Sequence, residues 1–376
     1  MSARDYIART AFCIVLLVIV VVGANYSVDP YGITGAARVD GFNRFKVDIN
    51  DYARLLKRYQ PMNAEYNALI IGNSRVEMGL DPSHSCLVDA GLNTYNLGVP
   101  GASVRMQMNY ALNVTYQQPI QAVFLSLDFP DFITTDPQPV ASLTSLMEES
   151  SGSLRLLPSG LPNPSYRSTK ALDYYKSLFS LDALTSSVKT VLLQSPLAPD
   201  RDNRGFNPAR DFENMVMVEG ARALFDQKLF DLELVYRREL FLRYPGETSS
   251  RRFEDIAEFL SLMRSQGVTV YVFINPFHQL YWDMLERYDL TPLYDDWLKT
   301  LSDILATYAD ANLQWWDFSR VEPYVSEPVP APGVRSGPLQ WFWEPAHYRR
   351  ELGDRMLESM LGPGCPGPDG FGVRRQ

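Results

Sequence analysis

The sequence predicts an α/β protein built on a mostly parallel, five-stranded sheet. Short and almost uninterrupted apolar runs alternate with stretches of helical periodicity, and the runs stop at glycine, asparagine or aspartate. Apolar runs without polar alternation are typical of strands buried on both faces, as in parallel sheets covered by helices. The predicted strands are 68–71, 94–97, 122–127, 268–274 and 313–317.

One long segment between the third and fourth strands breaks this alternation. Residues 132–250 contain a Ser/Pro-rich part, a helical part and a polar loop. We expect a helical insertion here. It forms a lid or a substrate wall at the strand ends; the alternative is a packing subdomain. The predicted helices outside it are 103–116, 253–264, 279–287, 293–309 and 348–361.

The N-terminus carries a membrane-targeting pattern. Arg4 and Arg9 precede an unbroken apolar run over 11–24. This run is short for a span, which needs about 20 residues, but its flanks can lengthen it at the interfaces. The basic flank predicts a cytoplasmic N-terminus and a domain on the other side of the membrane, outside the cytoplasm whether or not the segment is cleaved. The alternative is a cleaved signal peptide, because Val22-Gly23-Ala24 loosely fits a cleavage site.

Composition narrows the possible functions. Hydrophobic residues make up 46% of the 376 residues, enough for a packed core, and the net charge of −9 argues against a nucleic-acid partner. The histidines are scattered, so we expect no metal site and no cofactor. Cys86 and Cys365 either form a disulfide or remain free thiols. The expected organisation is an anchor or signal segment at 1–30, the α/β domain at 31–361 and a flexible tail at 362–376.

The carboxyl ends of the strands are where an α/β sheet binds ligands. Polar residues or glycine follow each predicted strand, so the candidate positions coincide with the edge of the sheet that this architecture uses. They are Ser74, Gly98, Asp128, Asn275 and Asp317.

Ser74 and His347 have the residue types of a nucleophile and its base. A serine hydroxyl needs a base to take its proton, and histidine titrates in the suitable range. Glu344 stands three residues before His347, a spacing that brings a carboxylate to the other ring nitrogen. The alternatives are a helix N-cap for Ser74 and a structural role for His347.

Three short motifs in order resemble the blocks of the SGNH (GDSL-like) hydrolase superfamily. They are Gly72-Asn73-Ser74-Arg75, Asn96-Leu97-Gly98 and Glu344-Pro345-Ala346-His347. The chain is similar in particular to the membrane-anchored bacterial branch related to polysaccharide O-acetyltransferases. The resemblance covers roughly 67–130 and 253–361 and leaves the insertion out.

This resemblance implies a three-layer, flavodoxin-like fold and a Ser74–His347–Glu344 triad. In this arrangement the backbone amides of Ser74 and Gly98 would bind the oxyanion. The family normally adds an asparagine side chain from the third block, where this chain has Asp128, and an ionised aspartate cannot donate. Asn275 would then fill the gap. Glutamate replaces the usual aspartate beside the histidine, with Asp317 as a reserve orienting group.

Further residues near these motifs are candidates for substrate binding. Arg75 either contacts an acidic glycan or forms a salt bridge, and His278 either lines the pocket or is structural. Trp343 either stacks on sugar rings or packs in the core. Asp128 completes this group.

The resemblance implies a serine esterase or O-acyltransferase acting on an acylated cell-envelope carbohydrate or a small acyl ester. The alternative is a non-catalytic scaffold or glycan-binding protein of an envelope assembly that keeps the fold. The departure at Asp128 supports this alternative.

Overall fold

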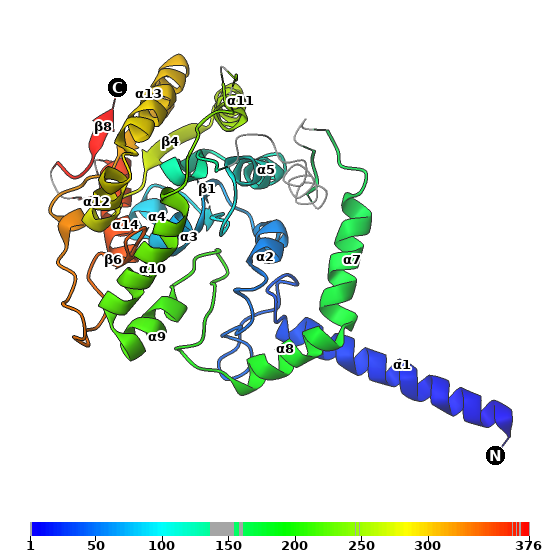
Figure 1. Ribbon diagram of the computed structural model, residues 1–376. Helices are drawn as coiled ribbons and strands as arrows, with labels where there is room; N and C mark the ends of the chain where they lie inside the picture. The colour runs from blue at the N-terminus through cyan, green and yellow to red at the C-terminus, as the bar shows by residue number, and fades with distance from the viewer. Residues whose placement is uncertain are drawn as a thin grey trace.

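A computed structural model describes residues 2–135, 154–157, 161–244, 246–247, 249–362, 364–365, 367 and 370–375. It contains a six-stranded sheet in the order β2-β1-β3-β4-β5-β8, flanked by helices (Figure 1). All neighbouring pairs are parallel except β5 with β8. The predicted α/β class and mostly parallel sheet are confirmed, but the sheet has six strands instead of five. The strands are β1 Ala68–Ile71, β2 Thr94–Asn96, β3 Ala122–Ser126, β4 Thr269–Ile274, β5 Leu313–Asp317 and β8 Val373–Arg375.

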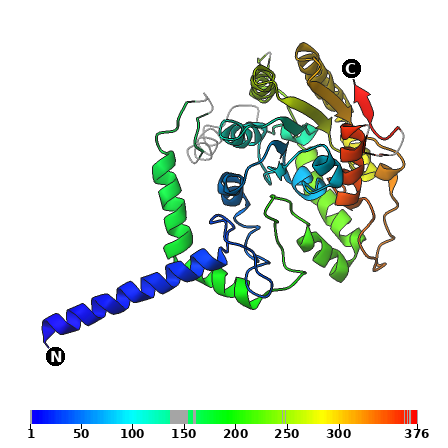
Figure 2. The same ribbon diagram turned by 180° about the vertical axis from the view of Figure 1, so that it is seen from behind.

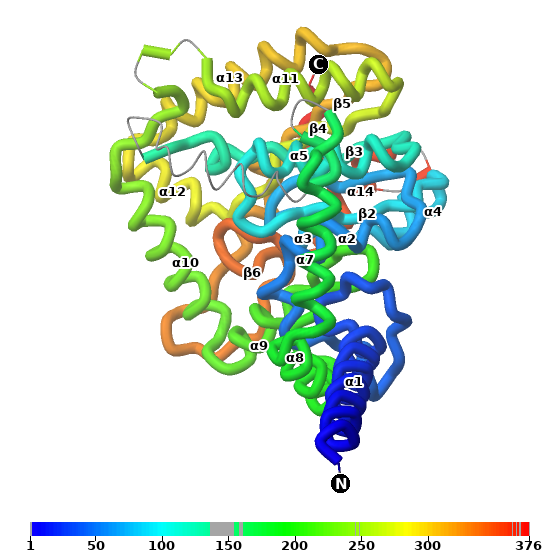
Figure 3. The backbone as a smooth tube through the Cα atoms, turned by 90° about the vertical axis from the view of Figure 1, so that its right-hand side faces the viewer, coloured from blue at the N-terminus to red at the C-terminus, as the bar shows by residue number. Residues whose placement is uncertain are grey.

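Helices cover both faces of this sheet, which makes the domain three layers thick. Alternate residues of β1 point to opposite sides, as the twofold period of a strand requires. Leu69 and Ile71 pack with α5, α11 and α13, whereas Ala68 and Ile70 pack with α3 and α14. Figure 3 shows α11 and α13 on one side of the strands and α3, α4 and α14 on the other. These helices are α3 Ser74–Gly79, α4 Ser85–Asp89, α5 Val104–Thr115, α11 Arg251–Ser265, α12 Gln279–Arg287, α13 Thr291–Thr307 and α14 Arg350–Leu361.

The insertion between β3 and β4 is helical in its described part, as expected from the sequence. Its first two helices pack against the N-terminal helix, and its last two reach the region of the strand ends (Figure 1). The insertion therefore contacts two parts of the molecule, the N-terminal helix and the region of the strand ends. Its helices are α7 Tyr166–Phe179, α8 Leu181–Leu192, α9 Arg210–Glu219 and α10 Ala221–Tyr236.

The N-terminal helix α1 spans Ala3–Val28, much longer than the apolar run that predicted it. It is long and apolar enough to cross a membrane, and most of it is exposed and projects from the domain (Figure 2). No linker follows it. Asp29 is buried, and its carboxylate accepts hydrogen bonds from the backbone N–H groups of Ile33 and Thr34 at 2.8 and 3.1 Å. A short helix α2, Ala53–Tyr59, then leads toward β1.

The C-terminal segment is tied to the domain at two points, in contrast to the expected flexible tail. Cys365 forms a disulfide with Cys86 of α4, with the Cα atoms 5.4 Å apart. Strand β8 then pairs with β5 through Asp317 and Val373, and Phe371 is buried. The sequence left the state of these two cysteines open, and the structure pairs them. Because both sulfurs are bonded to each other, they do not act as ligands with the neighbouring His84.

Helix α14 lies unusually close to α3. A Cβ atom on Gly353 would lie 1.8 Å from the backbone oxygen of Gly79, and one on Gly79 would lie 2.0 Å from the ring of Tyr348. Only glycine permits this approach. The contact fixes the segment before α14 against the helix that begins at Ser74.

Candidate active site

Ser74 is the first residue of α3, directly after the turn that ends β1. Asn73 caps this helix, because its side-chain oxygen accepts the Arg75 N–H at 2.9 Å. A Cβ atom on Gly72 would lie 2.8 Å from Val76 and 2.9 Å from Ser126, so the turn has room only for glycine. The strand, turn and cap together hold the Ser74 hydroxyl at the carboxyl edge of the sheet.

A β-hairpin brings a histidine and a carboxylate to this serine. Its strands are β6 Phe342–Glu344 and β7 His347–Tyr348. The Ser74 Oγ lies 2.8 Å from the His347 Nε2 across 273 positions of sequence. The Nδ1 of the same ring contacts the carboxylate of Glu344. A serine hydroxyl, an imidazole and a carboxylate are thus within hydrogen-bonding reach, in the order found in a Ser-His-acid triad.

Glu344 is held in its charged form by its neighbours. Burial opposes ionisation of this fully buried carboxyl group. The charge and hydrogen bond of His347, together with the Ala346 N–H at 2.9 Å, outweigh burial and lower the pKa of Glu344. A charged carboxylate at Nδ1 places the proton of a neutral imidazole there, which leaves Nε2 free to accept the serine proton.

Arg75 and Asp128, two of the predicted substrate-binding residues, are buried and paired with each other. The Arg75 guanidinium lies 3.2 Å from the Asp128 carboxylate. The Arg75 Nε also donates to the backbone oxygen of Ala346 at 3.0 Å, next to His347. Arg75 therefore ties the histidine hairpin to α3, and its charge does not reach solvent.

Two of the three predicted oxyanion donors, the Gly98 amide and the Asn275 side chain, are already engaged. The Gly98 N–H donates to the side-chain oxygen of Asn96 at 2.9 Å. The Asn275 amide donates to Ser126 at 2.6 Å and to Asp128 at 2.8 Å. The backbone N–H of Ser74 lies at the start of α3, where an amide has no acceptor within the helix. This N–H is the donor that remains beside the hydroxyl in the described part of the site.

The other two substrate-binding candidates also face inward. His278 is buried, caps α12 by accepting the Leu280 N–H at 3.2 Å, and contacts the Glu327 backbone oxygen at 2.7 Å. Burial lowers the pKa of His278 and keeps the ring neutral. Trp343 is buried beneath the guanidinium of Arg349, with the ring centre 4.7 Å from that group.

Asp317, the reserve orienting group, is paired elsewhere. Its carboxylate lies 2.6 Å from the guanidinium of Arg375 in β8 and accepts the Ser319 N–H at 2.9 Å. Among the described residues, the carboxylate at the Nδ1 of His347 is that of Glu344. The carboxylate at the end of β5 therefore forms an ion pair with the C-terminal strand β8. The sequence pattern did not predict this ion pair.

Two residues that the sequence analysis missed complete the surroundings. Phe212 of α9 stands edge-on to His347, with the ring centres 5.9 Å apart, so the insertion forms a wall of the site. Asp131 accepts the Asn73 side-chain amide at 2.9 Å. Burial and then the charge of Asp128 raise the pKa of Asp131 to about 6. Neither residue belongs to a sequence motif. The polar loop before α9 was the only sequence signal near Phe212, and Asp131 had none.

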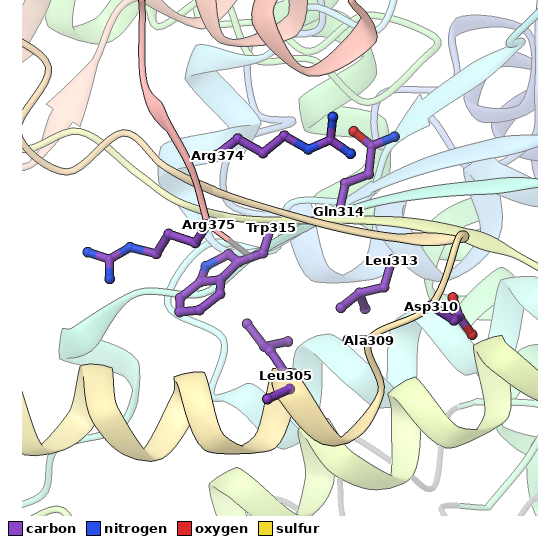
Figure 4. Close-up of a pocket in the computed structure, with 9 residues that line it drawn as sticks. Leu305, Ala309, Asp310, Leu313, Gln314, Trp315, Arg374 and Arg375 are labelled. Atoms are coloured by element: carbon purple, nitrogen blue, oxygen red, sulfur yellow. The ribbon is translucent and has the colours of Figure 1, made fainter.

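A pocket of about 660 Å³ lies away from this constellation (Figure 4). It is formed between α13 and the strands β5 and β8, at the far edge of the sheet from β1. Its lining includes the beginning of β5, whereas Ser74 follows the end of a strand. Its chemistry is therefore separate from that of the serine.

A scan against protein-family models gave no match, and a search of curated proteins gave none either. Functional inference for this chain thus starts from the arrangement of Ser74, His347 and Glu344.

Proposed function

We propose that this chain is an SGNH-type serine esterase or O-acyltransferase acting on acyl esters of a cell-envelope carbohydrate. The observation that carries the proposal is the 2.8 Å contact between the Ser74 Oγ and the His347 Nε2, with Glu344 buried at the other ring nitrogen. The parallel strand order β2-β1-β3-β4-β5, which is the flavodoxin-like order, also supports it.

In the proposed reaction, the Ser74 oxygen attacks the ester carbonyl while His347 accepts the serine proton. The resulting imidazolium is stabilised by Glu344. Collapse of the tetrahedral intermediate breaks the ester bond, and His347 returns the proton to the leaving alcohol. Water gives hydrolysis of the acyl-enzyme, whereas a sugar hydroxyl gives transfer. The Ser74 N–H would bind the oxyanion, and the carbonyl oxygen would compete with Asn96 for the Gly98 N–H.

We place the domain in the periplasm, tethered to the inner membrane by α1. The Cys86–Cys365 disulfide supports an oxidising compartment. An uncleaved anchor is favoured over a signal peptide because α1 stays helical past Ala24, and Asn25 is fully buried within the domain. The candidate cleavage site therefore lies in a folded helix.

A fluorophosphonate probe tests the enzymatic proposal on the full-length protein in detergent. We expect covalent labelling of the wild type and none of Ser74→Ala, with hydrolysis of p-nitrophenyl acetate lost in parallel. Ser83→Ala is the matched control, because Ser83 lies in an exposed turn and its side chain makes no contact that the mechanism uses. A folded wild-type protein that takes up no probe would contradict the proposal.

The second candidate, a non-catalytic scaffold or glycan-binding protein, is favoured by one observation. The Gly98 amide and the Asn275 side chain are both engaged by neighbouring groups, and loss of one oxyanion donor costs about 10²–10³ in rate. Absence of probe labelling, combined with retention of an envelope polysaccharide on a column of the immobilised protein, would support this candidate.

A further inference from the structure

Helix α8 carries its apolar side chains on the outside. Leu181, Val188 and Leu192 lie on one helical face and are 75%, 49% and 75% exposed. An amphipathic helix of a water-soluble domain turns its apolar stripe toward the core instead. The opposite face of α8, which is buried, is made of small or hydroxylated residues: Ala183, Ser186, Ser187 and Thr190.

Helix α7, which packs against α8, also exposes apolar side chains. Leu172, Tyr175 and Phe179 share a face and are exposed, and the rings of Tyr175 and Phe179 stack with their centres 5.1 Å apart. The other side of α7 docks on the domain, where the Tyr174 hydroxyl donates to the Ile33 backbone oxygen at 3.1 Å. We call the outward surface the elbow face. It consists of Leu172, Tyr175, Phe179, Leu181, Val188 and Leu192.

Asn25, a buried residue of α1, forms hydrogen bonds with both helices. The Asn25 amide donates to the Leu178 backbone oxygen at 2.8 Å, and its side-chain oxygen accepts the Ser187 hydroxyl at 2.8 Å. Asn25 is fully buried, whereas α1 before Val21 is exposed. Figures 1, 2 and 3 place α7 and α8 on the side of the molecule from which α1 projects.

We propose that the elbow face lies in the interfacial layer of the lipid bilayer that α1 crosses. Between Arg9 and Asn25 the helix rises about 24 Å, and the long Arg9 side chain extends toward the near boundary of a hydrocarbon core of about 30 Å. Asn25 would then lie at the membrane interface on the side of the domain, at the level where α7 and α8 contact α1. Exposed Tyr26 and Tyr175 have the chemistry of an interfacial aromatic belt, and exposed Lys176 suits anionic headgroups.

The elbow face belongs to two helices that both pack against α1, which is long and apolar enough to cross a membrane, and this attachment selects a bilayer as its partner. With no linker after Val28 and with Asp29 buried, the two attachments would hold the whole domain in one orientation at the membrane. This inference does not depend on the chemistry of Ser74.

Site-specific fluorescence on the full chain tests the proposal. In a Cys13→Ser background, Tyr175→Cys and Leu192→Cys are each labelled with the environment-sensitive dye NBD. Phe230→Cys on α10, 59% exposed, is the matched control. Each protein is placed as one copy in a nanodisc of phosphatidylcholine and phosphatidylglycerol with lipids spin-labelled near the headgroup. We expect the spin labels to remove most of the emission at 175 and 192 and to leave that at 230 unchanged.

Two outcomes would overturn the proposal. The first is equally weak quenching at 175, 192 and 230. The second is blue-shifted emission at 192 that spin-labelled lipids do not quench, because a protein surface would then cover the helix. In a separate sample whose lipids are spin-labelled on the acyl chain, a label on the native Cys13 reports whether α1 itself is in the bilayer. An unquenched label there would remove the basis of the proposal, and fluorophosphonate labelling would be unaffected in every case.

Discussion

At the scale of single residues, the site depends on a chain of buried polar contacts behind the serine. Arg75 ties the histidine hairpin to α3, and Asn73 caps that helix while it donates to Asp128 and Asp131. Such a network is stable only when each member is satisfied. Substitutions here should therefore change the position and protonation of neighbouring groups as well as remove one contact.

Glu344→Gln should slow labelling by a fluorophosphonate by about 10³-fold or more, because a neutral amide stabilises neither the imidazolium nor the productive tautomer. The Gln side chain still has an oxygen for the Ala346 N–H, so the fold should persist. Labelling rates measured by mass spectrometry test this, with Glu351→Gln on the exposed surface of α14 as control. Equal rates for the two variants would show that Glu344 has no part in activating the serine.

Asp131→Asn should stabilise the protein at pH 8 but not at pH 4. Folded Asp131 has a pKa of about 6, above the value of about 3.9 for an unfolded aspartate. The folded state therefore holds more protons between these values, and stability falls as the pH rises through this window. Removing the charge should raise Tm by about 2 °C at pH 8. Thermal scans at the two pH values decide this, and an identical change at both would argue against it.

At the scale of elements, the approach of α14 to α3 sets the distance between serine and histidine. Gly353→Ala would push the helices apart at Gly79 and should cost about 1–3 kcal/mol of unfolding free energy. Probe labelling should fall with it, because His347 lies just before α14. Urea unfolding and labelling of the same samples measure both effects. Gly337→Ala is the control, since open space surrounds that residue.

The sequence predicted the central strands of the sheet well but did not predict the edge strand β8. Strands 68–71 and 313–317 match to the residue, because buried parallel strands are apolar runs with clear stops. Strand β8 was missed since an Arg-rich edge strand has no such pattern. The sequence offered Arg75 either as a substrate contact or as a salt-bridge partner, and Asp128 as a substrate contact. Their pairing across 53 positions, like the use of the Gly98 amide by Asn96, exists only after folding.

At the scale of the whole molecule, one disulfide bond links the early part of the domain to its C-terminal segment. The Cys86–Cys365 disulfide spans 279 positions, and its removal by Cys365→Ser should cost about 2–4 kcal/mol of unfolding free energy. Chemical unfolding measures the loss, with Cys13→Ser as control. Unreduced protein unfolded in detergent should also bind one maleimide, at Cys13. Three maleimides per chain would mean that the disulfide is absent.

The distance in sequence between Ser74 and His347 has a consequence for biosynthesis. A chain emerges from its N-terminus, so Ser74 leaves the ribosome long before His347. Until the last hairpin and α14 have followed, the serine is an ordinary alcohol. On the proposed function, the nascent chain would be harmless to esters, and the hydroxyl would gain its reactivity only when synthesis is nearly complete.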